Sequence, residues 1–342
     1  MKYLLSLLSL FLTVTVLRAQ PYFPYTEGRL WGYLDRTGQT VIEPRFEAAE
    51  AFFQGVAAVR QDGLWGIIDT TGAWIAPPVY DRVFKPSEGL IRVQKDQRYG
   101  FISLKGEAVI PPRFVEAGDF HHGLAPVLLQ RHMLGLPAGM AKGYIDRTGT
   151  VRIPPRFPRA NTFSEEGLAP VATYRRFLLI PLEYRTGYID TTGTWVIPPE
   201  LTSGQPFHEG LAAASKGHKA GYLQPDGSWA IPPRFEQAGP FHEGLARVQQ
   251  QGKWGFINRT GTWVIQPIYT AARDFSEGRA PVYRNARWGY VDSAGREVIP
   301  PSFLAAGPFH YGLARVRFDE TSWGYIDRSG KAVFIFNYVS IP

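Results

Sequence analysis

The 342-residue sequence contains no cysteine. This absence excludes disulfide bridges, thiolate metal sites, a cysteine nucleophile and a lipid-modified N-terminal cysteine. The sequence also lacks a nucleophile elbow, a phosphate-binding glycine loop, a zinc-binding His-Glu-x-x-His and a dinucleotide fingerprint. We therefore expect a protein that is not an enzyme, with no catalytic residue, no cofactor and no metal site.

Long apolar runs are also missing after the first residues. Lys2 precedes an apolar stretch of 15 residues, and Leu17-Arg18-Ala19 places an aliphatic and a small residue where a signal peptidase acts. This stretch is shorter than the roughly 20 residues that span a bilayer. We expect residues 1–19 to be a cleaved signal peptide, with an uncleaved anchor as the alternative. No transmembrane segment is then left, and the protein is expected in the periplasm, at the cell surface or secreted.

Glycine is abundant and recurs at regular positions along the chain. Aligned glycines occupy positions 32, 66, 100, 143, 187, 221, 255, 289 and 324, at spacings of 34, 34, 43, 44, 34, 34, 34 and 35 residues. A fixed period of this length indicates a repeat architecture. We expect one domain over residues 20–342, with units that start near residues 23, 52, 84, 120, 163, 207, 241, 275 and 309.

Each unit reads as three short strands, exemplified by residues 244–248, 254–257 and 263–265. The turn before the third strand has the form Asp-x-x-Gly, as in Asp146-Arg147-Thr148-Gly149. We expect the Asp side chain to accept backbone NH groups two or three residues on, and the glycine to have a positive φ. A proline pair such as Pro232-Pro233 is expected to end the third strand.

Aromatic residues form rows at fixed positions of the unit. Indoles recur before the aligned glycine and at the start of the third strand, as Trp31, Trp65, Trp254, Trp288, Trp323, Trp74, Trp195, Trp229 and Trp263. Ordering 34 residues costs on the order of 50 kcal/mol at ~1.5 kcal/mol per residue, which one unit cannot offset. Neighbouring units must therefore stack and share these rings.

The expected fold is all-β: nine three-stranded units of about 34 residues in an open solenoid or superhelix. The first and last units depart from the pattern and are expected to be caps, as solenoid ends require. A closed β-propeller is the alternative. Three strands are few for a blade, and nine units exceed the usual number of blades.

The pattern aromatic-Gly-Tyr-Ile-Asp-x-x-Gly-x-Trp-Val-Ile-Pro-Pro-x-Phe resembles the bacterial WG repeat, also called the KWG repeat. Lys253-Trp254-Gly255 contains the name-giving triplet. The resemblance covers about residues 23–334. It implies a binding or interaction scaffold without a shared catalytic residue set, and it names no ligand. Tyr99, Lys142, Thr186 and Ala220 replace the tryptophan in four units.

Two units carry insertions in the turn between the first and second expected strands. From Val127 to Gly143 and from Val171 to Gly187 the distance is 16 residues, against seven from Val248 to Gly255. Insertions commonly gather on one functional face of a repeat protein. The candidate partner-binding residues are the apolar members of the insertions: Leu128, Leu129, Met133, Leu134, Leu136, Met140, Phe177, Leu178, Leu179, Ile180 and Leu182. The alternative is that the two insertions merely cover each other.

Charged residues also recur, but they are weaker signals. The formal net charge of +7 falls to +5 without Lys2 and Arg18. Arginine rows are compatible with weak attraction to anionic envelope polymers, and no nucleic-acid partner is expected. His121, His208, His242 and His310 share one position of the unit, where a turn role is favoured over metal binding. The partner is an unknown protein or, as the alternative, an envelope polysaccharide stacked on exposed aromatic rings.

Overall fold

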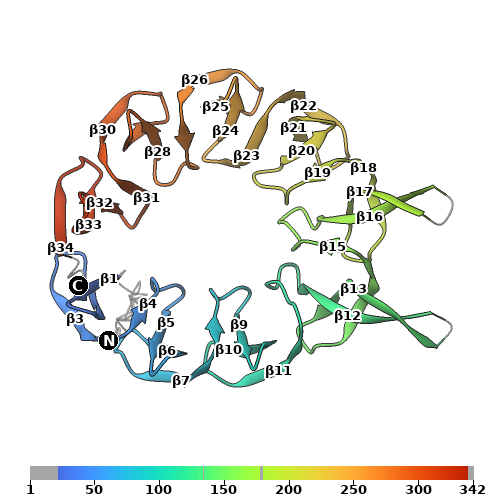
Figure 1. The fold of residues 1–342 in the computed structure, drawn as a ribbon, viewed down its shortest axis with the longest axis horizontal. Coiled ribbons are helices and arrows are strands. Elements are labelled where there is room, and N and C mark those ends of the chain that lie inside the picture. Colours follow the sequence, from blue (N-terminus) through green and yellow to red (C-terminus); the bar gives the residue numbers. More distant parts are fainter. Residues whose placement is uncertain (1–21, 134, 178–179, 338–342) are drawn as a thin grey trace, which may run out of the picture.

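The computed structural model describes residues 22–133, 135–177 and 180–337. These residues form nine antiparallel sheets, which are arranged as the blades of a closed ring (Figure 1). The expected signal peptide, residues 1–19, lies outside the described residues. Within the described ranges no helix is long and apolar enough to cross a membrane.

The strands of each blade follow the chain from the centre of the ring to its rim (Figure 1). Blades 1 to 3 contain β1 (Phe23–Glu27), β2 (Leu30–Leu34), β3 (Thr40–Phe46); β4 (Ala48–Ala49), β5 (Val56–Gln61), β6 (Leu64–Asp69), β7 (Trp74–Tyr80); and β8 (Arg82–Val83), β9 (Leu90–Lys95), β10 (Arg98–Ser103), β11 (Ala108–Phe114). Blades 4 to 6 contain β12 (Leu124–Met133), β13 (Leu136–Asp146), β14 (Val151–Phe157); β15 (Arg159–Ala160), β16 (Ala169–Phe177), β17 (Ile180–Ile189), β18 (Trp195–Leu201); and β19 (Ser203–Gly204), β20 (Ala212–Lys216), β21 (Lys219–Leu223), β22 (Trp229–Phe235). Blades 7 to 9 contain β23 (Gln237–His242), β24 (Leu245–Gln250), β25 (Lys253–Asn258), β26 (Trp263–Tyr269); β27 (Ala271–Ala272), β28 (Arg279–Arg284), β29 (Arg287–Asp292), β30 (Glu297–Phe303); and β31 (Ala305–His310), β32 (Leu313–Arg317), β33 (Ser322–Asp327), β34 (Ala332–Asn337).

The repeat is therefore a propeller blade, and the expected open solenoid of three-stranded units is wrong. The closed propeller, the alternative, is the fold. The missing strand is the innermost one, which is only two residues long in five blades, as in Ala48–Ala49 and Ala271–Ala272. Two residues carry no readable hydrophobic period, so the sequence does not reveal this strand.

The hydrophobic core lies between blades. In β25, Phe256 packs with Phe275 and Val282 of blade 8, whereas the next residue, Ile257, packs with Tyr222 of blade 6. Successive side chains of a strand point to opposite faces, and here both faces are covered by a neighbouring blade. The prediction that neighbouring units bury rings against each other is confirmed, since Phe256 and Ile257 each pack on a different neighbouring blade.

The glycine of each Trp-Gly pair lies beneath the outer strand of its own blade. A Cβ atom on Gly255 would lie 2.4 Å from the carbonyl oxygen of Ile265 and 2.8 Å from the nitrogen of Pro267. The pairing of β25 with β26 changes register at this point, which is the mark of a bulge. Prolines thus lie inside the outer strand. The expectation that they end this strand is wrong. An outer strand tolerates proline because one of its edges is unpaired.

In six of the nine blades a tyrosine hydroxyl donates to a backbone oxygen of the next blade. The buried Tyr222 hydroxyl of blade 6 donates to the carbonyl oxygen of Gly239 in blade 7 at 2.8 Å. Burial raises the pKa of Tyr222. The same bond runs from Tyr33 to Glu50, Tyr144 to Asn161, Tyr188 to Gln205 and Tyr290 to Gly307. Burying a hydroxyl without such a partner is unfavourable, so this bond fixes how neighbouring blades meet.

The ring closes where blade 9 meets blade 1. The Tyr325 hydroxyl donates to the carbonyl oxygen of Pro24 at 3.1 Å, and the rings of Trp31 and Trp323 lie 5.6 Å apart. Phe23 joins Trp323 and Tyr325 in one hydrophobic cluster. The expectation that the first and last units are solenoid caps is therefore wrong, because their apolar faces cover each other.

Candidate functional site

One face of the ring carries the turns that enter the second strand and the outer strand of each blade. Carboxylates of one blade bind the turns of the next on this face, which we call the latch face. Glu277 accepts a hydrogen bond from the NH of Gly312 and an ion pair from Arg328, both at 2.8 Å. Corresponding bonds join Glu88 to Gly123, Glu166 to Gly210, Glu209 to Gly244 and Glu243 to Gly278. Partial burial acts against ionisation, but the bonds from Arg328 and Gly312 hold the pKa of Glu277 below its usual value.

Arginines complete the latch face. The Arg113 guanidinium donates to the carbonyl oxygen of Gly149 in the next blade at 2.9 Å and lies 5.0 Å from the Phe114 ring. Arg45, Arg156 and Arg234 bind the glycines of the following blades in the same way. These arginines serve blade contacts, so they do not form the free basic row that the sequence left open.

The Asp-x-x-Gly turns also lie on the latch face. The Asp146 carboxylate accepts the Thr148 hydroxyl and the NH groups of Thr148 and Thr150, and Gly149 has a φ of 83°. These bonds, with Arg152, lower the pKa of Asp146 to about 2. The turn-forming role is confirmed, but the NH groups are two and four residues on.

Histidines occupy the turns of the latch face as well. The rings of His208 and His242 lie 5.3 Å apart, and burial together with His242 lowers the pKa of His208. In the described ranges no three His, Asp or Glu side chains converge as metal ligands would.

The opposite face carries the turns between the second and third strands. We call it the arm face, because β12–β13 and β16–β17 extend from it as two long hairpins, the arms, beyond the ring (Figure 1). They belong to the consecutive blades 4 and 5, so the expected placement of the insertions is confirmed. Each arm strand has 9 to 11 residues, against six in β24 and β25.

The candidate partner-binding residues fall into three groups. Leu128 and Leu129 are half-buried at the base of the first arm, where Leu129 packs on the core. Leu136 and Met140 are exposed, at 71% and 48%. Met133, Phe177 and Ile180 lie in described strands without described side chains, as does Leu182, and Leu134, Leu178 and Leu179 lie outside the described residues.

A tyrosine pair at the base of the second arm was not foreseen. The rings of Tyr174 and Tyr184 lie 4.7 Å apart on paired strand positions, and their hydroxyls are 3.0 Å apart. Arg159 stacks on Tyr184 at 4.4 Å and borders, with Asn161 and Thr202, a cavity of about 300 Å³. The signal for this pair in the sequence is the tyrosine on each side of the insertion.

Four of the five tryptophans before the aligned glycines, Trp31, Trp254, Trp288 and Trp323, have an arginine over the ring. Arg247 lies over Trp254 at 5.1 Å and Arg315 over Trp323 at 3.7 Å. A guanidinium on the ring face occupies the place where a sugar would stack. Trp74 and Trp195 are exposed at the rim, but each packs edge-on against a phenylalanine of the preceding blade. The geometry gives little support to glycan stacking.

Comparison with known proteins gives a family and a fold. The sequence model of the WG containing repeat matches residues 31–65, 65–99, 99–129, 143–173, 187–219, 221–254, 254–287 and 288–321. No curated protein matches the chain.

Among solved structures, one described as "Crystal structure of the eukaryotic initiation factor" has a TM-score of 0.65 at 10% identity, over 93% of this chain and 96% of that one. BamB from Moraxella catarrhalis has a TM-score of 0.40 at 13% identity, over 70% and 77% of the two chains. AztD from Citrobacter koseri has a TM-score of 0.39 at 12% identity, over 80% and 91%. At such identity the first likeness concerns the fold alone. Since the repeat model matches eight successive stretches between residues 31 and 321, the chain belongs to the WG-containing-repeat family.

Proposed function

We propose that this protein is a non-enzymatic binding scaffold of the cell envelope, and that its two arms form the contact with a protein partner. Leu136 and Met140 on the first arm carry the proposal, because they are large apolar side chains exposed on a two-stranded ribbon outside the ring. Exposed apolar groups on a protruding element are typical of interaction sites.

The second arm adds a different kind of contact. Tyr174 and Tyr184 are each more than a third exposed and Arg159 stacks beside them. Tyrosine and arginine are enriched among the side chains that dominate binding energy at interfaces. Because both arms leave consecutive blades, a partner that spans them contacts aliphatic side chains on one arm and aromatic side chains on the other.

The alternative is that the two arms cover each other's apolar side chains. The exposure of Leu136 and Met140 on the first arm favours a contact with a partner instead. The glycan alternative depends on exposed aromatic faces, and those of Trp254 and Trp323 lie under arginine.

Shortening both arms tests the proposal. Blade 7 supplies the replacement, because its Gln251-Gly252 turn has φ values of 51° and 71°, as a tight hairpin requires. Replacing residues 130–140 and 174–184 each by Gln-Gly restores the seven-residue distance of Val248 to Gly255. We expect the ring to fold and the protein captured from an envelope extract to be lost.

A point variant sharpens the test. Leu136→Ser with Met140→Ser is expected to release the same captured protein, whereas Ile268→Ser, an exposed apolar residue on the rim of blade 7, is the matched control. Capture that persists after arm shortening would reject the arms as the contact. Sedimentation with peptidoglycan or envelope polysaccharide tests the glycan alternative, and cell fractionation tests export.

A further inference from the structure

The arm face holds a cleft at the junction of blades 8 and 9, far along the ring from the arms. The cleft measures about 570 Å³, and its walls include Arg273, Gly307, Arg315, Arg317 and Trp323. Gly307 has no side chain to fill the space. We call this site the arginine cleft.

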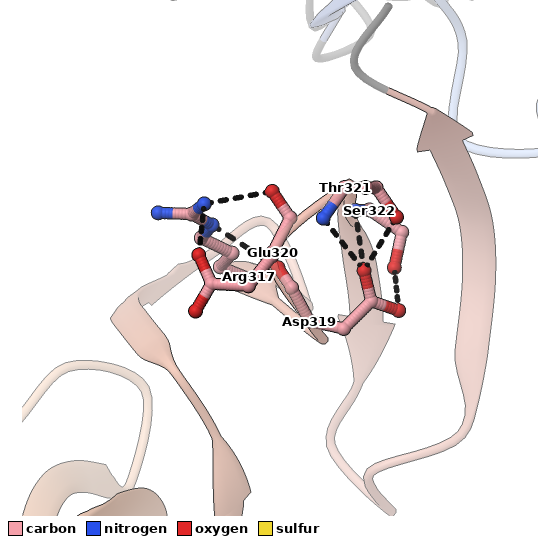
Figure 2. Close-up of polar contacts among 5 residues, drawn as sticks. All are labelled: Arg317, Asp319, Glu320, Thr321 and Ser322. Atoms are coloured by element: carbon pink, nitrogen blue, oxygen red, sulfur yellow. Dashed lines mark hydrogen bonds and ion pairs between the residues drawn. The ribbon is translucent and has the colours of Figure 1, made fainter. Parts of the chain in front are cut away.

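Arginines and the carboxylate of Glu320 line the arginine cleft. That carboxylate lies on the turn between β32 and β33 and pairs with Arg317 at 3.1 Å (Figure 2). Arg317 also donates to the backbone oxygens of Asp319 and Glu320, so the turn holds it at the rim (Figure 2). The Asp319 carboxylate fixes the turn itself by accepting the NH groups of Thr321 and Ser322 (Figure 2). These bonds hold the turn in place and engage Arg317 within it.

Arg273 is available to a ligand. It stacks on Trp288 at 5.1 Å, and no carboxylate pairs with it anywhere in the described ranges. Stacking on an indole restrains a guanidinium and leaves its NH groups to donate in the plane of the fork.

The chain itself shows which group such an arginine binds. Arg247 stacks on Trp254 and binds the Asp274 carboxylate of the next blade at 2.6 Å. Arg92 stacks on Phe84 and binds Asp119 at 2.8 Å. Arginine stacked on an aromatic ring therefore receives an aspartate carboxylate twice elsewhere on the inner wall of this ring.

A second cavity continues from the arginine cleft. It measures about 500 Å³ and shares Arg273. Its lining includes the ion pair of Arg247 and Asp274, and Ser276, His242 and His310 lie towards the latch face. Two cavities that share one arginine accommodate an extended chain better than a single small anion.

We propose that the arginine cleft binds an acidic peptide segment of a partner protein. An acidic side chain of the peptide binds Arg273, and the peptide backbone follows the inner wall of blade 9 towards His310. This site is separate from the arms, so it goes beyond the proposed function and stands or falls independently of it.

The probe is a fluorescent octapeptide of alternating aspartate and serine, titrated into the full chain and followed by anisotropy. We expect Arg273→Gln to weaken binding about tenfold, as for loss of a charge-assisted hydrogen-bonded pair. Arg287→Gln removes an exposed arginine from the neighbouring turn of the same face, outside the cleft, and is expected to change affinity by less than about twofold. Glu320→Gln removes the competing carboxylate and is expected to tighten binding roughly twofold.

If Arg273→Gln fails to fold, tighter binding by Glu320→Gln still supports the site. Glu320 is exposed, and its substitution is expected to change affinity in the opposite direction. Equal weakening by Arg273→Gln and Arg287→Gln would overturn the proposal, since it would mean unspecific attraction. A uronate oligomer of equal charge that binds as tightly, and is lost in Arg273→Gln, would replace the peptide by an acidic glycan. Loss of peptide binding in the arm-shortened protein would place the peptide on the arms and reject the cleft.

Discussion

The two faces of the ring differ in how many of their charged and polar groups are paired with groups of a neighbouring blade. On the latch face the same bonds recur from blade to blade, as between Glu277 and Gly312 or Arg113 and Gly149. On the arm face the turns differ in length, and Arg273 has no carboxylate partner in the described ranges. The regular face holds the blades together, and the irregular face offers groups that a ligand can bind.

Acid is expected to act on the latch face most strongly, because many carboxylates there have a lowered pKa. Such groups stabilise the folded state above the pH at which they titrate in the unfolded chain, about pH 4. This stability is lost as the pH falls towards about 2, the pKa of Asp146. The urea midpoint, followed by tryptophan fluorescence, should be constant from neutral pH down to about 5 and then fall steeply.

The arm-shortened protein should give the same acid profile, since its latch face is intact. A fall centred near pH 6.5, where histidine titrates, would instead assign the pH dependence to the histidine row.

Turn glycines give the next largest contrast. Gly261 on the latch face has a φ of 81°, and an added Cβ would lie 2.8 Å from the Arg234 guanidinium and 3.1 Å from Ile231. Gly252 on the arm face has a φ of 71° with open space around it. Gly261→Ala is expected to lower the free energy of unfolding by about 2–3 kcal/mol and Gly252→Ala by about 1 kcal/mol. Equal losses in urea denaturation would mean that packing at the latch contributes nothing.

Carboxylate substitutions should also lower stability more on the latch face than on the arm face, with smaller losses than the glycine substitutions. Glu277→Ala leaves the NH of Gly312 and the Arg328 guanidinium without their acceptor, at a cost of about 1–2 kcal/mol. Glu320→Ala removes an exposed carboxylate of the arm face and should change stability by less than about 0.5 kcal/mol. Thermal unfolding of the two variants side by side measures the difference, and similar shifts would contradict it.

The smallest effect is expected for the arms. Leu129 is the residue near their base that packs on the core, and it remains when residues 130–140 are replaced. Shortening both arms should leave the free energy of unfolding within about 0.5 kcal/mol of the original, because surface changes away from packing contacts rarely exceed this. A loss of several kcal/mol would show that the arms belong to the core.

The sequence predicted the contacts between units, but it did not predict that the units close into a ring. The rows of Phe256 and Ile257 show that both faces of each unit are buried, and this requirement holds in a solenoid as well as in a ring. What distinguishes the two is the angle between blades, and the Tyr222–Gly239 bond and the Gly255 bulge are features of the closed arrangement. Neither has a signal in the local pattern, because a buried tyrosine and a glycine each have several common roles.

The candidate site was predicted in part. Unequal spacing placed the arms correctly, since a longer turn must extend outwards where the neighbouring blades keep their length. Their tyrosine pair was missed because cross-strand pairing joins Tyr174 to Tyr184 only once the register is known. The arginine cleft was not predicted for a related reason: Arg273 follows β27 in blade 8 and Arg317 ends β32 in blade 9, and only the packing of these blades brings them to one cleft.

The contact between Tyr325 and Pro24 has a consequence for how the molecule comes apart. Every other blade boundary is crossed by a continuous peptide chain, but here two segments 301 residues apart meet through noncovalent contacts. Closing so long a loop carries the greatest entropy cost of any contact in the ring. Opening should therefore begin at this seam, and amide hydrogens of β1 and β34 should exchange with deuterium before those of β25, in the middle of an unbroken arc.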